Sequence, residues 1–212
     1  MKNNFLFSGF FRFFTRVFDL MWLNILFLVC CLPIITIGAS TSALYSVCLK
    51  LVRNEETYVT KDFFHAFRQN LKQGIFLHLI LSLITIIVAF DLFVMWNIME
   101  YGILYKWAFI VMIIFSALFF IAAIYVYPLL AQFNNTVKGY LRAAFGLALK
   151  HFPYSVMFLL LTATPIAAAL LIPGAPEWEI LMCLMIGFSG MVYMNSCFFS
   201  VIFNKYIKEE TQ

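Results

Sequence analysis

The chain has 212 residues, of which 64% are apolar or aromatic and 11% are charged. A soluble domain carries about 25% charged residues, which it needs to cover its surface. Fourteen Lys and Arg against ten Asp and Glu cannot do this, so the composition excludes a soluble globular domain, a disordered chain and a secreted disulfide scaffold. The net charge of +4 fits basic loops at a membrane surface rather than a nucleic-acid partner.

Four long apolar segments are predicted to be full transmembrane helices. About 20 helical residues cross a hydrocarbon core of about 30 Å, and in lipid the backbone must satisfy its own hydrogen bonds. The segments are Ile75–Trp96, Trp107–Leu130, Phe152–Ile172 and Ile180–Phe203. The sequence therefore predicts an all-α polytopic membrane protein whose partner along most of its surface is the lipid bilayer.

The first apolar run, Leu20–Leu49, is too long for one straight span and too short for two complete ones. Pro33 in its middle removes a backbone donor and crowds the preceding turn. We expect a broken pair of half-length helices, about Val17–Leu32 and Thr41–Arg53, with Ser40 as the N-cap of the second. The total is then five to six crossings.

Basic residues are distributed unevenly between the connecting segments. Lys and Arg number five in segment 50–72, three in 131–151 and two in the C-terminal tail, against one in 96–106. The positive-inside rule places the richer segments, and with them the C-terminus, on the cytoplasmic side of the cell membrane. The N-terminus joins that side if the first run doubles back and lies outside if the run is one kinked span. The first alternative is favoured because it also gathers the N-terminal basic residues inside.

Aromatic and basic residues precede each hairpin, in segments 10–16, 60–72 and 139–150. Each segment is predicted to form a short amphipathic helix at the inner headgroup layer. The pattern indicates repeat units 1–53, 54–131 and 132–212 within a single membrane domain, 1–212. The alternative, that Phe and basic residues simply collect at cytoplasmic edges, stays open. The candidate contacts for a partner or for lipid are Arg12, Arg16, Phe63, Phe67, Arg68, Lys72, Arg142 and Lys150.

Two features inside the apolar spans are candidates for substrate binding or coupling. Asp91 is an acidic residue within a predicted span, where a charge is costly. It either pairs with Lys106 across the short hairpin or has a functional role. The broken helix places small and hydroxyl-bearing residues beside unwound backbone, as in some transporter sites, although the same residues also permit close helix packing. These candidates are Thr36, Gly38, Ser40 and Thr41.

Signatures of enzymatic chemistry are missing from the sequence. It has no Gly-rich phosphate loop, no HExxH and no GxSxG, and its three histidines are widely spaced. The five cysteines follow no metal-ligand spacing. We therefore expect no enzyme, no cofactor, no metal and no nucleic-acid partner.

Two motifs in tandem resemble the YesL family of bacterial multipass membrane proteins, a domain of unknown function. The first is Leu32–Ser40 followed by Ala43-Leu44-Tyr45, and the second is Arg53–Tyr58 followed by Phe63-Phe64 and Phe67–Gln73. The resemblance implies a protein often encoded beside carbohydrate uptake and degradation genes, including sugar ABC transporters. We expect an accessory or regulatory protein of such a system, with a sugar ABC transporter or a sensor kinase as partner. The alternative is a small-solute transporter with its site at the broken N-terminal helix. The sequence does not specify a homo-oligomer.

Overall fold

The structure is a computed structural model that describes residues 3–98, 102–171 and 175–210. Side chains are described for residues 13–98, 102–164, 178 and 180–203. Within these ranges the regular elements are all helical, which confirms the predicted all-α class. They are α1 (Asn3–Cys31), a 3₁₀ turn η1 (Ile34–Thr36), α2 (Ile37–Val52), α3 (Val59–Ile98), α4 (Ile103–Gln132), α5 (Val137–Lys150), α6 (Phe152–Leu171), α7 (Ala175–Met182), a π-helical turn η3 (Cys183–Gly187) and α8 (Phe188–Glu210).

By length and composition, five helical segments in the described ranges could cross a membrane. They are Phe13–Cys31, Ile34–Val52, Val59–Ile98, Ile103–Gln132 and Ile180–Phe203. A sixth arises if α5 and α6, which are bent by 102° at their junction, form one broken span. The predicted number of five to six crossings is confirmed at this level. The predicted full span Phe152–Ile172, however, counts only as part of the bent pair, and each of the two N-terminal helices is long enough to be a span of its own instead of half of one.

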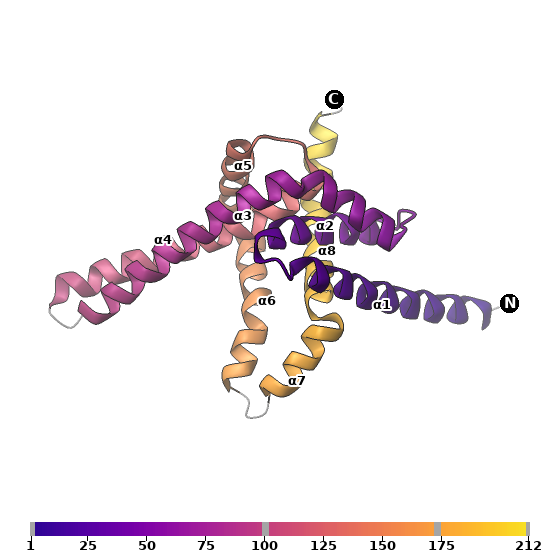
Figure 1. Cartoon of the computed structure of the whole chain (residues 1–212), viewed down its shortest axis with the longest axis horizontal. Helices are drawn as coiled ribbons and strands as arrows, with labels where there is room; N and C mark the ends of the chain where they lie inside the picture. The colour runs from indigo at the N-terminus through magenta and orange to yellow at the C-terminus, as the bar shows by residue number, and fades with distance from the viewer. Residues whose placement is uncertain (1–2, 99–101, 172–174, 211–212) are drawn as a thin grey trace.

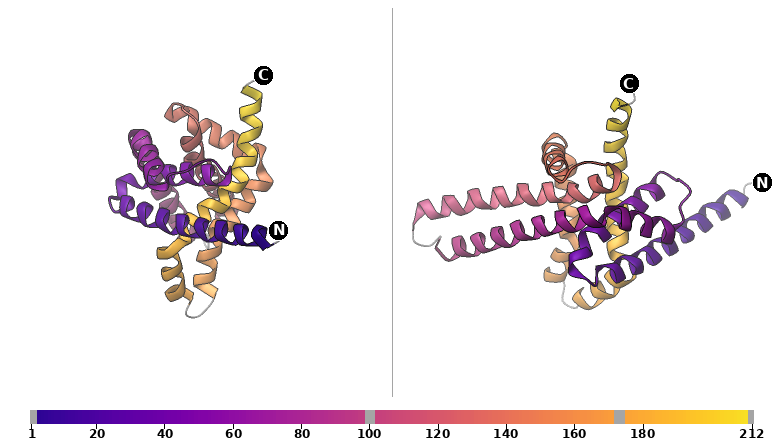
Figure 2. Two further views of the ribbon diagram at one scale, coloured as in Figure 1. Left: turned by 90° about the vertical axis from the view of Figure 1, so that its right-hand side faces the viewer. Right: turned by 45° about the horizontal axis from the view of Figure 1, so that its top comes forward.

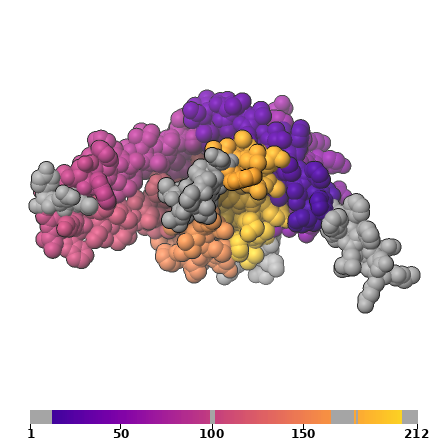
Figure 3. Space-filling view, turned by 90° about the horizontal axis from the view of Figure 1, so that it is seen from below, coloured from indigo at the N-terminus to yellow at the C-terminus, as the bar shows by residue number. Residues whose placement is uncertain are grey.

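The helices run in two main directions. α3 and α4 form a long antiparallel hairpin that projects to the left in Figure 1, and α6, α7 and α8 run across it in both Figure 1 and Figure 2. In the space-filling view of Figure 3 the hairpin stands out from the remaining helices as an arm. Its side chains Phe90, Phe93, Ile114 and Phe115 are each more than 60% exposed, as expected of a lipid-facing surface.

The break between α1 and α2 lies at the predicted proline but is shorter than expected. α1 ends at Cys31, and after Leu32 and Pro33 the chain enters the 3₁₀ turn that leads directly into α2 at Ile37. Proline fits the start of a helix because its missing N–H would have no partner there. Ser40 is therefore inside α2, and the predicted N-cap at this residue is wrong. The first helix is also longer than the predicted half-helix, since it begins at Asn3.

The chain doubles back after this break, and α2 returns alongside α1 (Figure 1). α2 ends in a Schellman turn, in which the N–H of Glu55 donates to the Lys50 carbonyl at 3.1 Å and that of Asn54 donates to the Leu51 carbonyl at 3.2 Å. Asn54 has a φ of 56°, the left-handed conformation that asparagine tolerates at this position. The turn presents the Asn54 side chain to Arg16 of α1, whose Nη2 donates to Asn54 Oδ1 at 2.8 Å.

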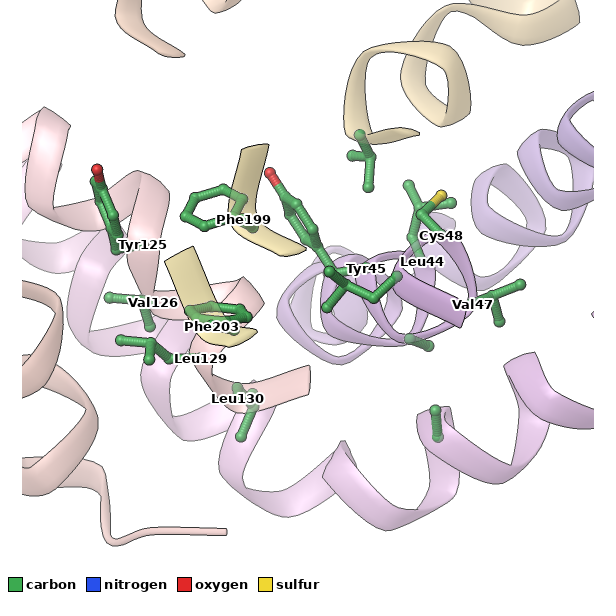
Figure 4. Close-up of a cluster of buried hydrophobic side chains, with 14 of the residues drawn as sticks. Leu44, Tyr45, Val47, Cys48, Tyr125, Val126, Leu129, Leu130, Phe199 and Phe203 are labelled. Carbon is green, nitrogen blue, oxygen red and sulfur yellow. The ribbon is translucent and has the colours of Figure 1, made fainter. Parts of the chain in front are cut away.

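The hydrophobic core lies where α2, α4, α6 and α8 meet. Figure 4 shows α2 side chains facing Phe199 and Phe203 of α8 and a row of α4 side chains that begins at Tyr125. Phe199 stacks on Phe158 of α6 with ring centroids 4.4 Å apart and meets Tyr125 edge-on at 5.2 Å. The Tyr125 hydroxyl shares a hydrogen bond of 2.8 Å with Ser155, so its polar end is satisfied within the core.

The predicted amphipathic segments differ in their structure. Segment 60–72 is not a separate helix but the first third of the continuous helix α3, and segment 10–16 is part of α1. Only segment 139–150 forms its own helix, α5, which turns sharply at His151. Pro153 explains the difference, because proline cannot continue a hydrogen-bonded helix, whereas Ile75 stands at the corresponding position of the proposed repeat. The repeat itself stays a prediction.

α2 crosses α3 at a contact made of glycines. A Cβ added at Gly38 would overlap the Gly74 carbonyl oxygen and lie 2.7 Å from the Cβ of His78. A Cβ added at Gly74 would lie 2.7 Å from the Cα of Ala39. The two backbones therefore approach as closely as only small residues allow, the arrangement that stabilises helix pairs in membranes.

We expect Gly38→Ala to destabilise the protein by about 1–3 kcal/mol, because the added methyl group has no space against α3. Thermal unfolding in detergent measures the change. Gly146→Ala is the matched control, since nothing lies within 4 Å of a Cβ built at this helical glycine. The control should be neutral or gain about 0.5–1 kcal/mol. Equal melting temperatures for Gly38→Ala and the wild type would contradict the close crossing.

Candidate functional site

The hydroxyl groups at the helix break donate to backbone carbonyls of the same chain. Thr36 Oγ1 donates at 2.7 Å to the carbonyls of Cys30 and Pro33, and Ser40 Oγ donates to Cys30 at 3.0 Å. Thr41 Oγ1 donates to the Ile37 carbonyl one turn earlier. The bonds from Thr36 and Ser40 satisfy the Cys30 carbonyl at the end of α1, where the helical bonding is interrupted. Together with the glycine crossing at Gly38, they support the packing interpretation of this segment.

Asp91 lies on α3 within the projecting hairpin and is half-buried. Trp96 packs on Phe109 across the hairpin, with ring centroids 5.9 Å apart. In this antiparallel register Lys106 lies between Trp96 and the tip of the hairpin. Asp91 lies further from the tip than Trp96. No ion pair joins Asp91 and Lys106, whose side chains are both described. A substrate or coupling role for Asp91 stays a prediction.

A stripe of four basic side chains follows the first third of α3. Lys61, His65, Arg68 and Lys72 have the spacing i, i+4, i+7, i+11, which places them on one face of the helix, and all four are exposed. Within the part of the chain that has described side chains, none of them forms an ion pair. We call these four residues the cationic stripe.

An open groove of about 790 Å³ lies along the N-terminal part of the cationic stripe, from Lys61 to Arg68. Lys50 at the end of α2 lines it and pairs with Asp62 Oδ1 at 3.0 Å, while Asp62 Oδ2 accepts the backbone N–H of Tyr58 at 2.9 Å. Both carboxylate oxygens are thus engaged within the chain. Phe64 adds an exposed aromatic ring to the groove. The groove can accept an anionic group beside an apolar one.

The remaining predicted contacts are dispersed. Phe63 is fully buried and stacks against the half-buried Phe67 at 6.3 Å, so it packs the core instead of forming the exposed contact that was predicted. Arg142 and Lys150 are exposed on α5. The side chain of Arg12 lies outside the described residues. Of the predicted contacts, Arg68 and Lys72 therefore lie together in the cationic stripe, whereas Phe63, Arg142 and Lys150 do not belong to it.

Sequence reasoning missed a buried polar clamp between α1 and the π-helical turn η3. Asn24 is fully buried, and its Nδ2 donates at 2.9 Å to the carbonyls of both Cys183 and Leu184. Its Oδ1 accepts the backbone N–H of Ser189 at 3.1 Å, and Ser189 Oγ donates to the Leu20 carbonyl at 2.7 Å. A π-turn shifts the hydrogen-bond register of the helix. Asn24 supplies side-chain partners to the backbone groups of Cys183, Leu184 and Ser189 at this turn.

A signal for this clamp was present in the sequence. Asn24 is a lone amide in an apolar segment, and polar side chains inside membrane spans usually face other helices. Because an amide carries no formal charge, a search for charged residues within the spans does not find Asn24. The π-turn that it serves has no sequence signature that we could have used.

A metal centre has no support from the residues whose side chains are described. No three His, Cys, Asp or Glu among them lie close enough together to hold a metal ion. The described helices, with their length and their exposed apolar surfaces, define a polytopic helical membrane protein.

Residues 20–92 match the family model described as "Protein of unknown function, DUF624". This segment spans α2, most of α3 and both motifs, so the resemblance to the YesL family, which contains this domain, is confirmed over this region. Comparison with curated proteins and comparison with solved structures gave no match.

We expect Asn24→Ala to destabilise the protein by about 1–3 kcal/mol, because it leaves the amide of Ser189 and the π-turn carbonyls without their side-chain partner in a buried place. Unfolding in detergent measures the loss. Asn97→Ala is the matched control, since Asn97 is exposed and donates only to the Phe93 carbonyl of its own helix. Similar effects of the two substitutions would argue against the clamp.

Proposed function

We propose that the protein is an accessory or regulatory component of a bacterial carbohydrate-uptake system in the cell membrane. The cationic stripe on α3 is the observation that carries this proposal, because it offers a docking surface for an acidic segment of the transporter or of a sensor kinase. The link to carbohydrate uptake comes from the family resemblance, and the stripe lies within the matched segment 20–92.

The composition of the stripe and its groove suits a protein partner. Arginine and aromatic residues are enriched in protein interfaces, and Arg68 and Phe64 both line the groove. The exposed charges of Lys61, Arg68 and Lys72 on one helical face attract an acidic segment and fix its register. The Asp62 carboxylate in the groove is bound by Lys50 and by the backbone N–H of Tyr58, so it is engaged within the chain.

The hydrogen bonds at the helix break favour this role over the alternative of a small-solute transporter. A substrate site needs polar groups that can turn to the solute. Here the hydroxyls of Thr36, Ser40 and Thr41 donate to the backbone instead. Solute flux through liposomes that contain this protein alone would overturn the accessory role.

We expect the double variant Lys61→Glu/Arg68→Glu to lower recovery of the partner by about tenfold when the tagged protein is purified from its native membrane, because charge reversal repels an acidic segment. The loss should be greater at low than at high ionic strength. Quantitative mass spectrometry of sugar-transporter subunits and sensor kinases measures the recovery.

Lys106→Glu is the control for this experiment. It reverses an exposed basic residue near the α3–α4 tip, away from the stripe. Its recovery of partner should equal that of the wild type. Undiminished recovery with the double variant would remove the stripe from the docking surface.

A further inference from the structure

Arg16 of α1 has a buried guanidinium nitrogen that makes no hydrogen bond. Its Nη2 donates to Asn54 Oδ1 at 2.8 Å, whereas Nη1 is buried without a partner. A charged donor that is buried without a partner is destabilising, so an anionic acceptor beside this guanidinium is favoured.

A cavity of about 460 Å³ lies against Arg16 and is lined by both polar and apolar side chains. Asn54 of the α2–α3 turn and Tyr193 of α8 line it together with Arg16. Three separate parts of the chain thus bring a guanidinium, an amide and a phenol to one place. Val17, which directly follows Arg16, and Leu20, about one turn further along α1, add apolar side chains to the lining.

Asp19 is the acidic residue whose charge interacts with Arg16 in the described part of α1. It lies three residues along the helix from Arg16, but the two side chains do not approach to the 4.0 Å of an ion pair. Asp19 therefore does not occupy the free donor. Its negative charge opposes any anion that binds beside Arg16.

We propose that this cavity binds a phosphate group, with the head of an anionic phospholipid as the source that the apolar wall fits. Guanidinium groups bind phosphate oxygens through their N–H donors, and Arg16 lines the cavity with donors beyond the one that it gives to Asn54. Tyr193 and Asn54 lie where they can donate to further oxygens, and Val17 and Leu20 face the first acyl carbons. This site shares no residue with the cationic stripe, so the two proposals stand or fall separately.

Titration of phosphatidylglycerol into the purified full-length protein in detergent, followed by native mass spectrometry, tests the proposal. Arg16→Gln should weaken binding about tenfold, and Arg16→Lys should weaken it less, because lysine keeps the charge but not the planar fork. Asp19→Asn should strengthen binding by about threefold, since it removes the opposing charge. Lys138→Gln, at another exposed basic position on α5, is the control and should leave binding unchanged.

Excess inorganic phosphate separates the two sources of the ligand. Failure to displace phosphatidylglycerol supports a lipid site, whereas displacement supports a phosphate site and overturns its restriction to lipid. Equal affinity of the wild type and Arg16→Gln for phosphatidylglycerol would overturn the phosphate site. If Arg16→Gln does not fold, as judged by circular dichroism, Asp19→Asn decides: tighter binding supports the site, and unchanged or weaker binding refutes it.

Discussion

The close crossing of α2 and α3 at Gly38 and Gly74 is the contact on which the arrangement of the other helices depends. α2 is largely buried, and besides α3 it packs against α8 and α4. In lipid no hydrophobic effect drives helices together, so the approach of two backbones must supply the attraction through dispersion and short polar contacts. With α2 seated on α3, its opposite faces are available to receive the aromatic side chains of α8 and α4 that close the core (Figure 4).

The same constraint governs the polar groups. A bilayer offers no water to an unpaired carbonyl, so each interruption of a helix needs a partner from the protein. At the α1–α2 break Thr36 and Ser40 serve the Cys30 carbonyl, and at the π-turn Asn24 serves Cys183 and Leu184. The polar residues at these two interruptions therefore have a structural explanation before any catalytic or transport role is considered.

The sequence allowed some of these features to be predicted and concealed others. Hydropathy located the four long helices, and Pro33 located the break, because both effects are local. The start of α2 was missed since a proline can lead into a helix as well as end one, and only the packing of Gly38 on α3 decides between them. The Asn24 clamp depends on a π-turn some 160 residues away, which no local pattern encodes. The stripe at Lys61, His65, Arg68 and Lys72 was foreseeable from spacing, whereas the burial of Phe63 and of Arg16 Nη1 required the tertiary structure.

The two basic regions of the protein differ in what they can recognise, and exposure accounts for the difference. A charge in water interacts with many anions at similar strength and is screened within about 10 Å, so the cationic stripe suits an extended acidic surface whose affinity sums over several weak contacts. Arg16 is partly withdrawn from water, and its free donor has a fixed position set by the bond to Asn54. There an anion gains more from a single contact, but only if its shape fits the cavity. A protein partner at the stripe and a phosphate beside Arg16 would thus be recognised by different physical means, at two places that share no residue.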